Sequence, residues 1–156
     1  MTLNNLSFVS FEPRDGKFIG FLSMEAAIGS ERDPEAILHK ATKIYERSII
    51  RIRSILVEIK SARANRKPIA ARKIWQIGDI IFELRDNLEK LSLQLDGVYV
   101  HLVRDLGVKR KWLEKVIILR RYLPIESLVP KSLNWGRCEK GTRRVAERLS
   151  KRLSLD

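Results

Sequence analysis

The sequence predicts a mainly α protein: a helical bundle with a long N-terminal helix, a helix-turn-helix-like unit and a small N-terminal β-hairpin. Three observations lead to this prediction. A turn flanked by phenylalanines lies near the N-terminus, an apolar stripe with helical spacing follows residue 33, and a glycine separates two short amphipathic segments near residue 107. At 156 residues the chain has the length of one domain with one core. We expect a hairpin arm over residues 1–32 and a basic helical domain over residues 33–156.

The hairpin is predicted from two short segments, Phe8–Phe11 and Phe18–Phe21, on either side of a turn. Pro13 suits the first corner of that turn, and Gly16 can adopt a positive φ. The phenylalanines could stack on nucleic-acid bases, as on single-strand-binding surfaces. Because the segment is acidic overall, packing against the helices or against a second subunit is the favoured interpretation.

A long helix is predicted from Pro34 to about Ala64. Asp33 can cap its first turn, and proline is favoured at the first helical position. Apolar residues then recur at alternating three- and four-residue spacings, as in a packed helical seam. Several weak seam residues favour an intramolecular partner, although a homodimer through helix 34–64 or the hairpin stays open. The seam residues are Leu38, Ala41, Tyr45, Ser48, Ile52, Ile55, Ile59 and Ala62.

A second helix is predicted from Pro68 to about Leu91, antiparallel to the first. Asp79, Glu83 and Asp86 lie at positions i, i+4 and i+7, so the three carboxylates share one helical face. Such a face suits either a metal or a set of salt bridges. No histidine or cysteine lies nearby in sequence and basic residues abound elsewhere, so salt bridges are the favoured interpretation.

A helix-turn-helix-like unit is predicted over residues 98–123. Leu102, Val103 and Leu106 form the inner face of a short first helix, and Gly107 allows a tight left-handed turn after it. In this geometry the first residues of the second helix are placed at the DNA surface.

The second helix of this unit is amphipathic at 100° per residue. The side chains predicted to face inward are Trp112, Val116, Leu119 and Leu123. The side chains predicted to project outward are Arg110, Glu114 and Arg121, with Lys111 and Ile118 beside them and Lys115 at the rim. The residue after the turn, where serine or threonine usually caps the helix, is Lys109.

A last helix is predicted from about Arg137 or Thr142 to Leu153, with Val145 and Leu149 in its inner stripe together with Leu153. The narrow apolar stripe has no aromatic anchor, which disfavours a membrane surface as the partner. Phosphate contact and a solvated tail are both open interpretations. The basic residues on its outer side are Lys140, Arg143, Arg144, Arg148, Lys151 and Arg152.

The net charge of +12 and the pI of about 10.2 favour a polyanionic partner through counterion release. The surplus is concentrated in residues 35–67 and 109–156. A heat-adapted composition would explain many of the charges but not their sign. On the long helix a further basic ridge is either a solvated face, which is favoured, or a phosphate contact; it consists of Lys40, Lys43, Arg47 and Arg51.

The sequence contains no recognisable catalytic or metal-binding motif. His39 and His101 are isolated, and Cys138 is the only cysteine. The fragment from Glu58 to Lys60 matches the E-x-K pattern of one nuclease class, but that pattern belongs on a strand and here lies inside a predicted helix. We therefore expect no enzymatic activity, no metal and no cofactor.

The chain has no apolar run approaching the roughly 18 residues that a membrane span needs. Its N-terminus lacks the basic-then-apolar layout of a secretory signal. A single cysteine fits a reducing compartment. We expect a cytoplasmic protein without membrane contact.

Four segments follow one another in an order that resembles a known family. They are Trp75–Ile81, Leu102–Leu113, Leu119–Pro124 and Leu133–Trp135. Together they are similar to the landmarks of the YhcG-type N-terminal domain, a helix-turn-helix-like module that precedes a PD-(D/E)xK nuclease domain. The resemblance implies that Lys109 to Leu123 corresponds to the module's second helix.

The chain departs from this family in two ways. It ends at Asp156, where the nuclease domain would begin, and its hairpin and helix 34–64 are not part of the match. The resemblance therefore implies a stand-alone binding or accessory protein.

The expected function is non-catalytic binding of nucleic acid, with DNA favoured. The alternative is a helical interaction subunit of a larger nucleoprotein or defence complex, with the seam and the hairpin facing protein partners. The residues predicted to bind nucleic acid are Lys109, Arg110, Lys111, Lys115, Arg121, Arg143, Arg144 and Arg148.

Overall fold

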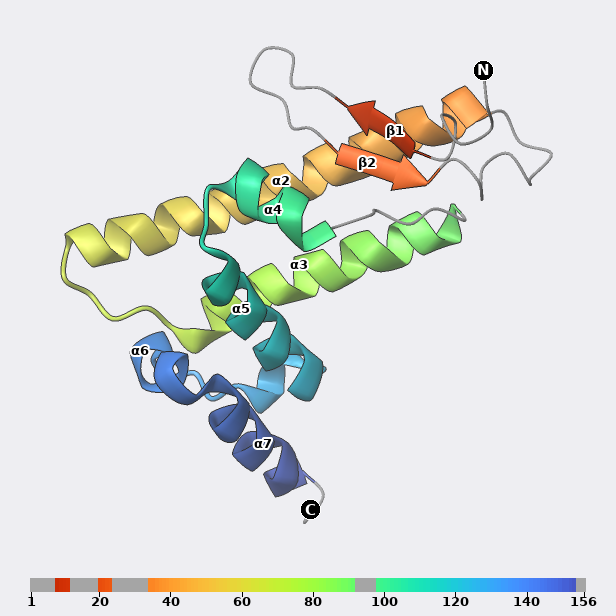
Figure 1. The fold of residues 1–156 in the computed structure, drawn as a ribbon. Coiled ribbons are helices and arrows are strands. Elements are labelled where there is room, and N and C mark those ends of the chain that lie inside the picture. The colour runs from red at the N-terminus through yellow and green to blue at the C-terminus, as the bar shows by residue number, and fades with distance from the viewer. Residues whose placement is uncertain (1–7, 12–19, 24–33, 92–97, 154–156) are drawn as a thin grey trace. The chain divides into compact units, whose positions relative to one another are not determined.

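The computed structural model describes residues 8–11, 20–23, 34–91 and 98–153, and the fold is mainly helical, as the sequence predicts (Figure 1). The chain divides into two compact units. Unit 1 consists of Met1–Arg51 and Ile81–Val108, and unit 2 consists of Ile52–Ile80 and Lys109–Asp156. The predicted boundary between residues 32 and 33 stays a prediction, because both residues lie outside the described part of the chain.

Unit 1 contains a two-stranded antiparallel sheet. Strand β1 (Phe8–Phe11) pairs with strand β2 (Gly20–Ser23), with Phe8 opposite Ser23 and Phe11 opposite Gly20. The second strand begins two residues after the start of the segment from which it was predicted. The turn residues Pro13 and Gly16 lie outside the described residues.

Two antiparallel helices, α2 (Pro34–Ala64) and α3 (Ala71–Lys90), contribute to each unit. In unit 1 an ion pair joins Arg51 to Glu83 at 3.1 Å, and in unit 2 another joins Lys73 to Glu58 at 2.7 Å. The order of these partners along the two helices requires an antiparallel arrangement. The seam residues of α2 that are buried are Ala41, Tyr45, Ser48, Ile52 and Ile59.

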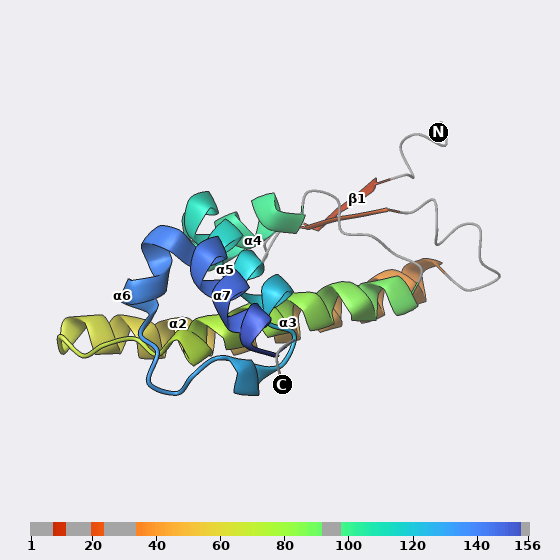
Figure 2. The ribbon, with the colours of Figure 1, turned by 90° about the horizontal axis from the view of Figure 1, so that it is seen from below.

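Helix α3 begins at Ala71, so the prediction that Pro68 occupies its first helical position is wrong. The backbone of residues 69–71 is instead held in an isolated antiparallel bridge (Figure 2). The N–H of Trp135 donates to the carbonyl of Ile69 at 2.8 Å, and the N–H of Ala71 donates to the carbonyl of Leu133 at 2.9 Å. Pairing with a segment more than 60 residues away therefore outweighs the local preference for helix after proline.

The core of unit 2 forms where α3 packs closely on α5 (Arg110–Tyr122). The indole N–H of Trp75 donates to the carbonyl of Leu123 at 2.6 Å. The guanidinium of Arg120 lies 5.5 Å from the centre of the Trp75 ring and forms an ion pair with Asp79 at 3.0 Å. A Cβ atom on Gly78 would lie only 2.7 Å from the Cβ of Arg120, so the absence of a side chain there permits the close approach of the two helices.

The C-terminal part of unit 2 consists of α6 (Trp135–Cys138), a 3-10 turn (Glu139–Gly141) and α7 (Thr142–Leu153). Another 3-10 turn, Glu126–Leu128, precedes them. The hydroxyl of Thr142 donates to the carbonyl of Cys138 at 2.9 Å, which ties α7 to α6.

The core-facing residues of α7 are Thr142, Ala146 and Leu149. The prediction that Val145 belongs to the inner stripe is only partly right, because Val145 is half-buried. Contacts with α5 set the rotation of α7 about its axis, and a hydropathy pattern with few apolar residues could not fix that rotation. The side chain of Leu153 lies outside the described residues.

Candidate nucleic-acid interface

The positive charge of the chain resides in unit 2. That unit contains 21 of the 31 lysines and arginines and 7 of the 19 acidic residues, for a net charge of +14. Unit 1 contains the other 10 basic and 12 acidic residues, for a net charge of −2. Because polyanion binding scales with the cations brought to the phosphates, unit 2 is the candidate interface.

All eight predicted binding residues lie in unit 2, on α5, at its N-cap or on α7, and α7 packs against α5. Seven of the eight side chains are exposed, and Lys115 is half-buried, in line with its predicted place at the rim. The structure thus brings together, within one compact unit, residues that lie as far apart in sequence as Lys109 and Arg148.

Helix α5 has the amphipathic division that its periodicity predicts, with two differences. Val116, Leu119 and Leu123 are buried as expected, and Leu113 and Ile117 are buried as well. Trp112, predicted to face inward, is only half-buried. Helical periodicity does not explain these differences, because at 100° per residue Trp112 lies between the buried Leu119 and Val116, whereas Ile117 lies at the edge of the buried arc.

The N-terminal end of α5 has no side-chain cap. Lys109 occupies the N-cap position in an extended conformation, and its side chain makes no capping hydrogen bond. On the exposed face, Arg110 forms an ion pair with Glu114 at 3.3 Å, one turn away. An exposed pair of this kind contributes little to stability, so a phosphate can compete for Arg110.

Helix α7 presents arginines without acidic partners. Among the described residues, no carboxylate lies within ion-pair distance of Arg143, Arg144 or Arg148. Arg144 and Arg148 are one helical turn apart, on the side of α7 opposite its core-facing residues. The outer face of α7 therefore offers guanidinium groups that form no salt bridge with any residue the structure describes.

The region of the predicted helix-turn-helix contains α4 (Val98–Leu106), a residue in the left-handed region and α5. Gly107 has φ +67°, as the sequence predicts. Leu102 is buried, whereas Val103 and Leu106 are half-buried. Helix α4 belongs to unit 1 and α5 to unit 2, so the helix-turn-helix itself stays a prediction.

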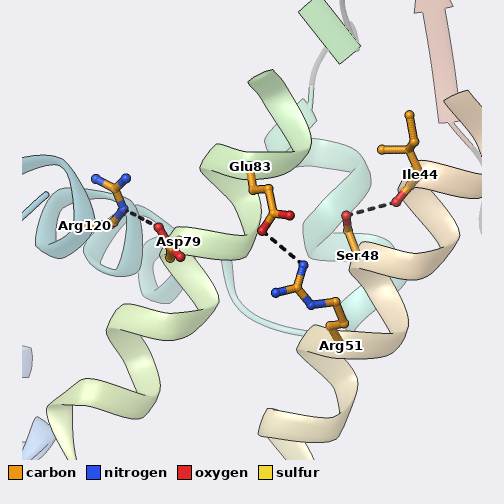
Figure 3. Close-up of polar contacts among 6 residues, drawn as sticks. All are labelled: Ile44, Ser48, Arg51, Asp79, Glu83 and Arg120. Carbon is orange, nitrogen blue, oxygen red and sulfur yellow. Dashed lines mark hydrogen bonds and ion pairs between the residues drawn. The ribbon is translucent and has the colours of Figure 1, made fainter. Parts of the chain in front are cut away.

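The acidic face of α3 forms salt bridges, the interpretation that the sequence favours. In unit 2, Asp79 accepts a hydrogen bond from Nε of Arg120, and in unit 1, Glu83 accepts one from Arg51 (Figure 3). Asp86 is exposed and forms no ion pair with another described residue. Within the part of the chain that the structure describes, no group of three or more His, Cys, Asp and Glu side chains could hold a metal ion.

Glu58, His101 and Cys138, the side chains considered for catalysis, are either paired with another side chain or buried. Glu58 is paired with Lys73, and His101 is buried in α4, with its Nδ1 3.0 Å from the guanidinium of Arg104. Cys138 is fully buried, and this burial raises the pKa of its thiol, which disfavours the nucleophilic thiolate.

Sequence reasoning missed one group of basic residues in unit 2. We name this group the tip cluster: it lies at the end of α2 and in the connection to α3, and consists of Lys60, Arg63, Arg66 and Lys67. All four side chains are exposed. A signal was present, because residues 59–78 include six lysines and arginines and no aspartate or glutamate.

Of the helices that the structure describes, none combines the length and the apolar character that crossing a membrane requires. The chain matches no known protein family, no curated protein and no solved structure. The charge and geometry of unit 2 therefore provide the basis for a functional proposal.

Proposed function

We propose that this chain is a non-catalytic nucleic-acid-binding protein that docks on duplex DNA through the basic side chains of α5 and α7. One observation supports this above all: unit 2 has a net charge of +14, and most of its predicted binding residues are exposed and form no ion pair with a described residue. Burying such side chains against protein would cost desolvation energy, whereas phosphate oxygens can accept their hydrogen bonds. The cytoplasmic location expected from the sequence is part of this proposal.

The surface of unit 2 suits a phosphate backbone better than stacked single-stranded bases. Single-strand binders place exposed aromatic rings under successive bases. In unit 2, Trp75 and Trp135 are buried, and Trp112 and Tyr122 are half-buried. The exposed groups of α5 and α7 are instead mainly lysines and arginines, which favours contact with phosphates over recognition of bases.

The helix-turn-helix-like role of residues 98–123 belongs to the same proposal. In it, the left-handed turn at Gly107 leads into α5, and Arg110 and Lys111 approach the DNA first. Arg110 forms an ion pair with Glu114. To read a base, its guanidinium would have to leave Glu114 and be oriented toward the base edge, so the ion pair favours contact with phosphate over recognition of a base. The resemblance to the YhcG-type domain stays a prediction that agrees with this role.

The salt dependence of duplex affinity tests the proposal. Fluorescence anisotropy between 50 and 200 mM salt should give a slope of log K against log salt of about −7 if all eight residues contact phosphates, and about −4 if half do. Arg110→Glu together with Lys111→Glu should weaken binding and flatten the slope. Single-stranded DNA and RNA of equal length, measured at one salt concentration, should bind more weakly. A flat salt response of the wild-type chain would show that unit 2 is not a phosphate-binding surface.

Unit 1 provides an observation for the second candidate function, a helical interaction subunit. Its net charge is near zero, and two large apolar side chains are exposed, Ile50 on α2 at 65% and Val100 on α4 at 62%. Single exposed apolar residues are common on monomers, so this observation is weaker than the charge of unit 2.

Light scattering distinguishes the second candidate from the first. An interaction subunit that pairs with itself through helix 34–64 or the hairpin should show a mass that rises with concentration toward twice 18.1 kDa. The variant Ile50→Glu should then remain monomeric, because it places a charge in the paired surface. A constant mass of 18.1 kDa at all concentrations would exclude the homodimer.

A further inference from the structure

Helix α2 ends in a backbone motif that usually contains glycine. The N–H of Lys67 donates to the carbonyl of Ala62 at 2.8 Å, and the N–H of Arg66 donates to the carbonyl of Arg63 at 3.1 Å. These two bonds define a Schellman motif, in which the residue after the C-cap adopts the left-handed conformation. That residue is Arg66, with φ +54°, the one positive φ of a non-glycine residue in the described part of the chain.

An arginine at this position is conformationally unfavourable, because its Cβ crowds the backbone where glycine has none. The two backbone hydrogen bonds hold Arg66 in this conformation, but its side chain adds no described contact that would favour arginine over glycine. The side chain of Arg66 is exposed, and no described residue forms a hydrogen bond or ion pair with it. Unfavourable backbone conformations that the surrounding structure holds in place cluster at functional positions.

The sequence around Arg66 is basic, because residues 59–78 include six lysines and arginines and no aspartate or glutamate. Glu58, the last acidic residue before the tip cluster, is already paired with Lys73 at 2.7 Å. Arg72 is also engaged, since its Nε donates to the carbonyl of Val129 at 2.6 Å. The tip cluster thus contains four cations that form no ion pair with any described residue.

The tip cluster is anchored to the C-terminal part of unit 2. The connection that follows Arg66 enters the backbone bridge between residues 69–71 and 133–135, and α6 begins at the end of that bridge (Figures 1 and 2). On the N-terminal side of Arg66, Asn65 is held against the end of α2, because its side-chain amide donates to the carbonyl of Ser61 at 3.0 Å. The backbone that presents the four cations, at the end of α2 and in the turn after it, is therefore held in place, which lowers the entropic cost of binding a ligand.

We propose that the tip cluster is a second phosphate-binding site, which takes the sugar–phosphate backbone of the nucleic acid bound by α5 and α7, with Arg66 as its central contact. This inference rests on the proposed function. It explains why an arginine occupies a position where glycine would be more stable. It also adds a contact on the α2–α3 connection, outside the predicted helix-turn-helix.

Substitution of Arg66 by glycine separates stability from binding. Arg66→Gly removes both the unfavourable Cβ and the charge, so its Tm should rise by roughly 2 °C. Its affinity for duplex DNA should fall roughly five- to tenfold at 0.1 M salt, and the magnitude of the salt slope should fall by about 0.9, as expected for one lost phosphate contact. Arg66→Lys keeps the charge and should bind like the wild-type chain. Lys90→Gln removes one exposed charge from unit 1 and is the matched control.

The outcomes distinguish this inference from the proposed function. If the wild-type chain binds duplex DNA with the expected salt slope, but Arg66→Gly and the double variant Arg63→Gln with Lys67→Gln bind as tightly, the tip cluster is not a site. An equal loss of affinity in Arg66→Lys, or a lower Tm of Arg66→Gly, would overturn the role given to Arg66. If the affinity of the wild-type chain for duplex DNA does not depend on salt, both the proposed function and the phosphate-binding role of the tip cluster are wrong.

Discussion

Gly78→Ala is expected to destabilise the protein by about 2 kcal/mol, which corresponds to a decrease in Tm of roughly 4–8 °C. The new Cβ would lie 2.7 Å from the Cβ of Arg120 and 3.1 Å from the carbonyl oxygen of Val116. Neither atom is the end of a flexible side chain, so the two helices would have to separate. That movement would also disturb the ion pair of Arg120 with Asp79 and its contact with Trp75.

Helix propensity alone would predict the opposite effect, a stabilisation by Gly78→Ala. Alanine in the interior of a helix is more favourable than glycine by about 1 kcal/mol, so any destabilisation must come from the packing of α3 on α5. Gly136→Ala is the matched control, because Gly136 lies in α6 with no atom within 4 Å of its Cβ position. Thermal unfolding should show a lower Tm for Gly78→Ala and an unchanged or slightly higher Tm for Gly136→Ala. Equal stability of both variants would mean that α3 and α5 are farther apart than the structure shows.

The largest effect on binding is expected from α7. A triple variant, Arg143→Gln with Arg144→Gln and Arg148→Gln, should weaken duplex affinity roughly 100- to 1,000-fold at 0.1 M salt, because each lost phosphate contact removes about 0.9 from the salt slope. The three side chains are exposed and have no ion pair with a described residue, so their removal should leave the fold intact. Fluorescence anisotropy over a salt series gives both the affinity and the slope.

The control for this variant removes the same charge from unit 1. Lys40, Lys43 and Lys90 are exposed there, and their simultaneous replacement by glutamine lowers the net charge of the chain equally. Its affinity should stay within about threefold of the wild-type value, because exposed charges that make no phosphate contact are screened at this ionic strength. If both triple variants weaken binding alike, net charge alone accounts for the binding and α7 is no specific contact surface.

Local features of the structure follow closely from the sequence. The apolar residues of α5 recur with helical periodicity, and Val116, Leu119 and Leu123 are buried accordingly. Gly107 adopts a positive φ after a short helix, as expected where a tight turn follows. The acidic side chains Asp79 and Glu83 form ion pairs with arginines, as the salt-bridge interpretation of this face expects, whereas Asp86 forms none with another described residue.

Features that depend on contacts between distant segments were not predictable in this way. The start of α3 at Ala71 depends on backbone pairing with residues 133–135. The rotation of α7 depends on its contact with α5, which buries Ala146 rather than Val145. The requirement for glycine at position 78 depends on where the Cβ of Arg120 lies.

The sequence by itself determined the helical character of the chain, the faces of α5 and the positive charge, because each depends on residue type and on spacing within a few turns of helix. The tertiary structure decided where that charge resides. It divided the chain so that unit 2 has a net charge of +14 and unit 1 a net charge of −2, and it joined α5, α7 and the tip cluster within one unit. It also placed Arg66 in the left-handed region. The physical reason is that hydrogen bonds and packing between distant residues fix these positions, and their energies exceed the small local preferences that a sequence pattern reveals.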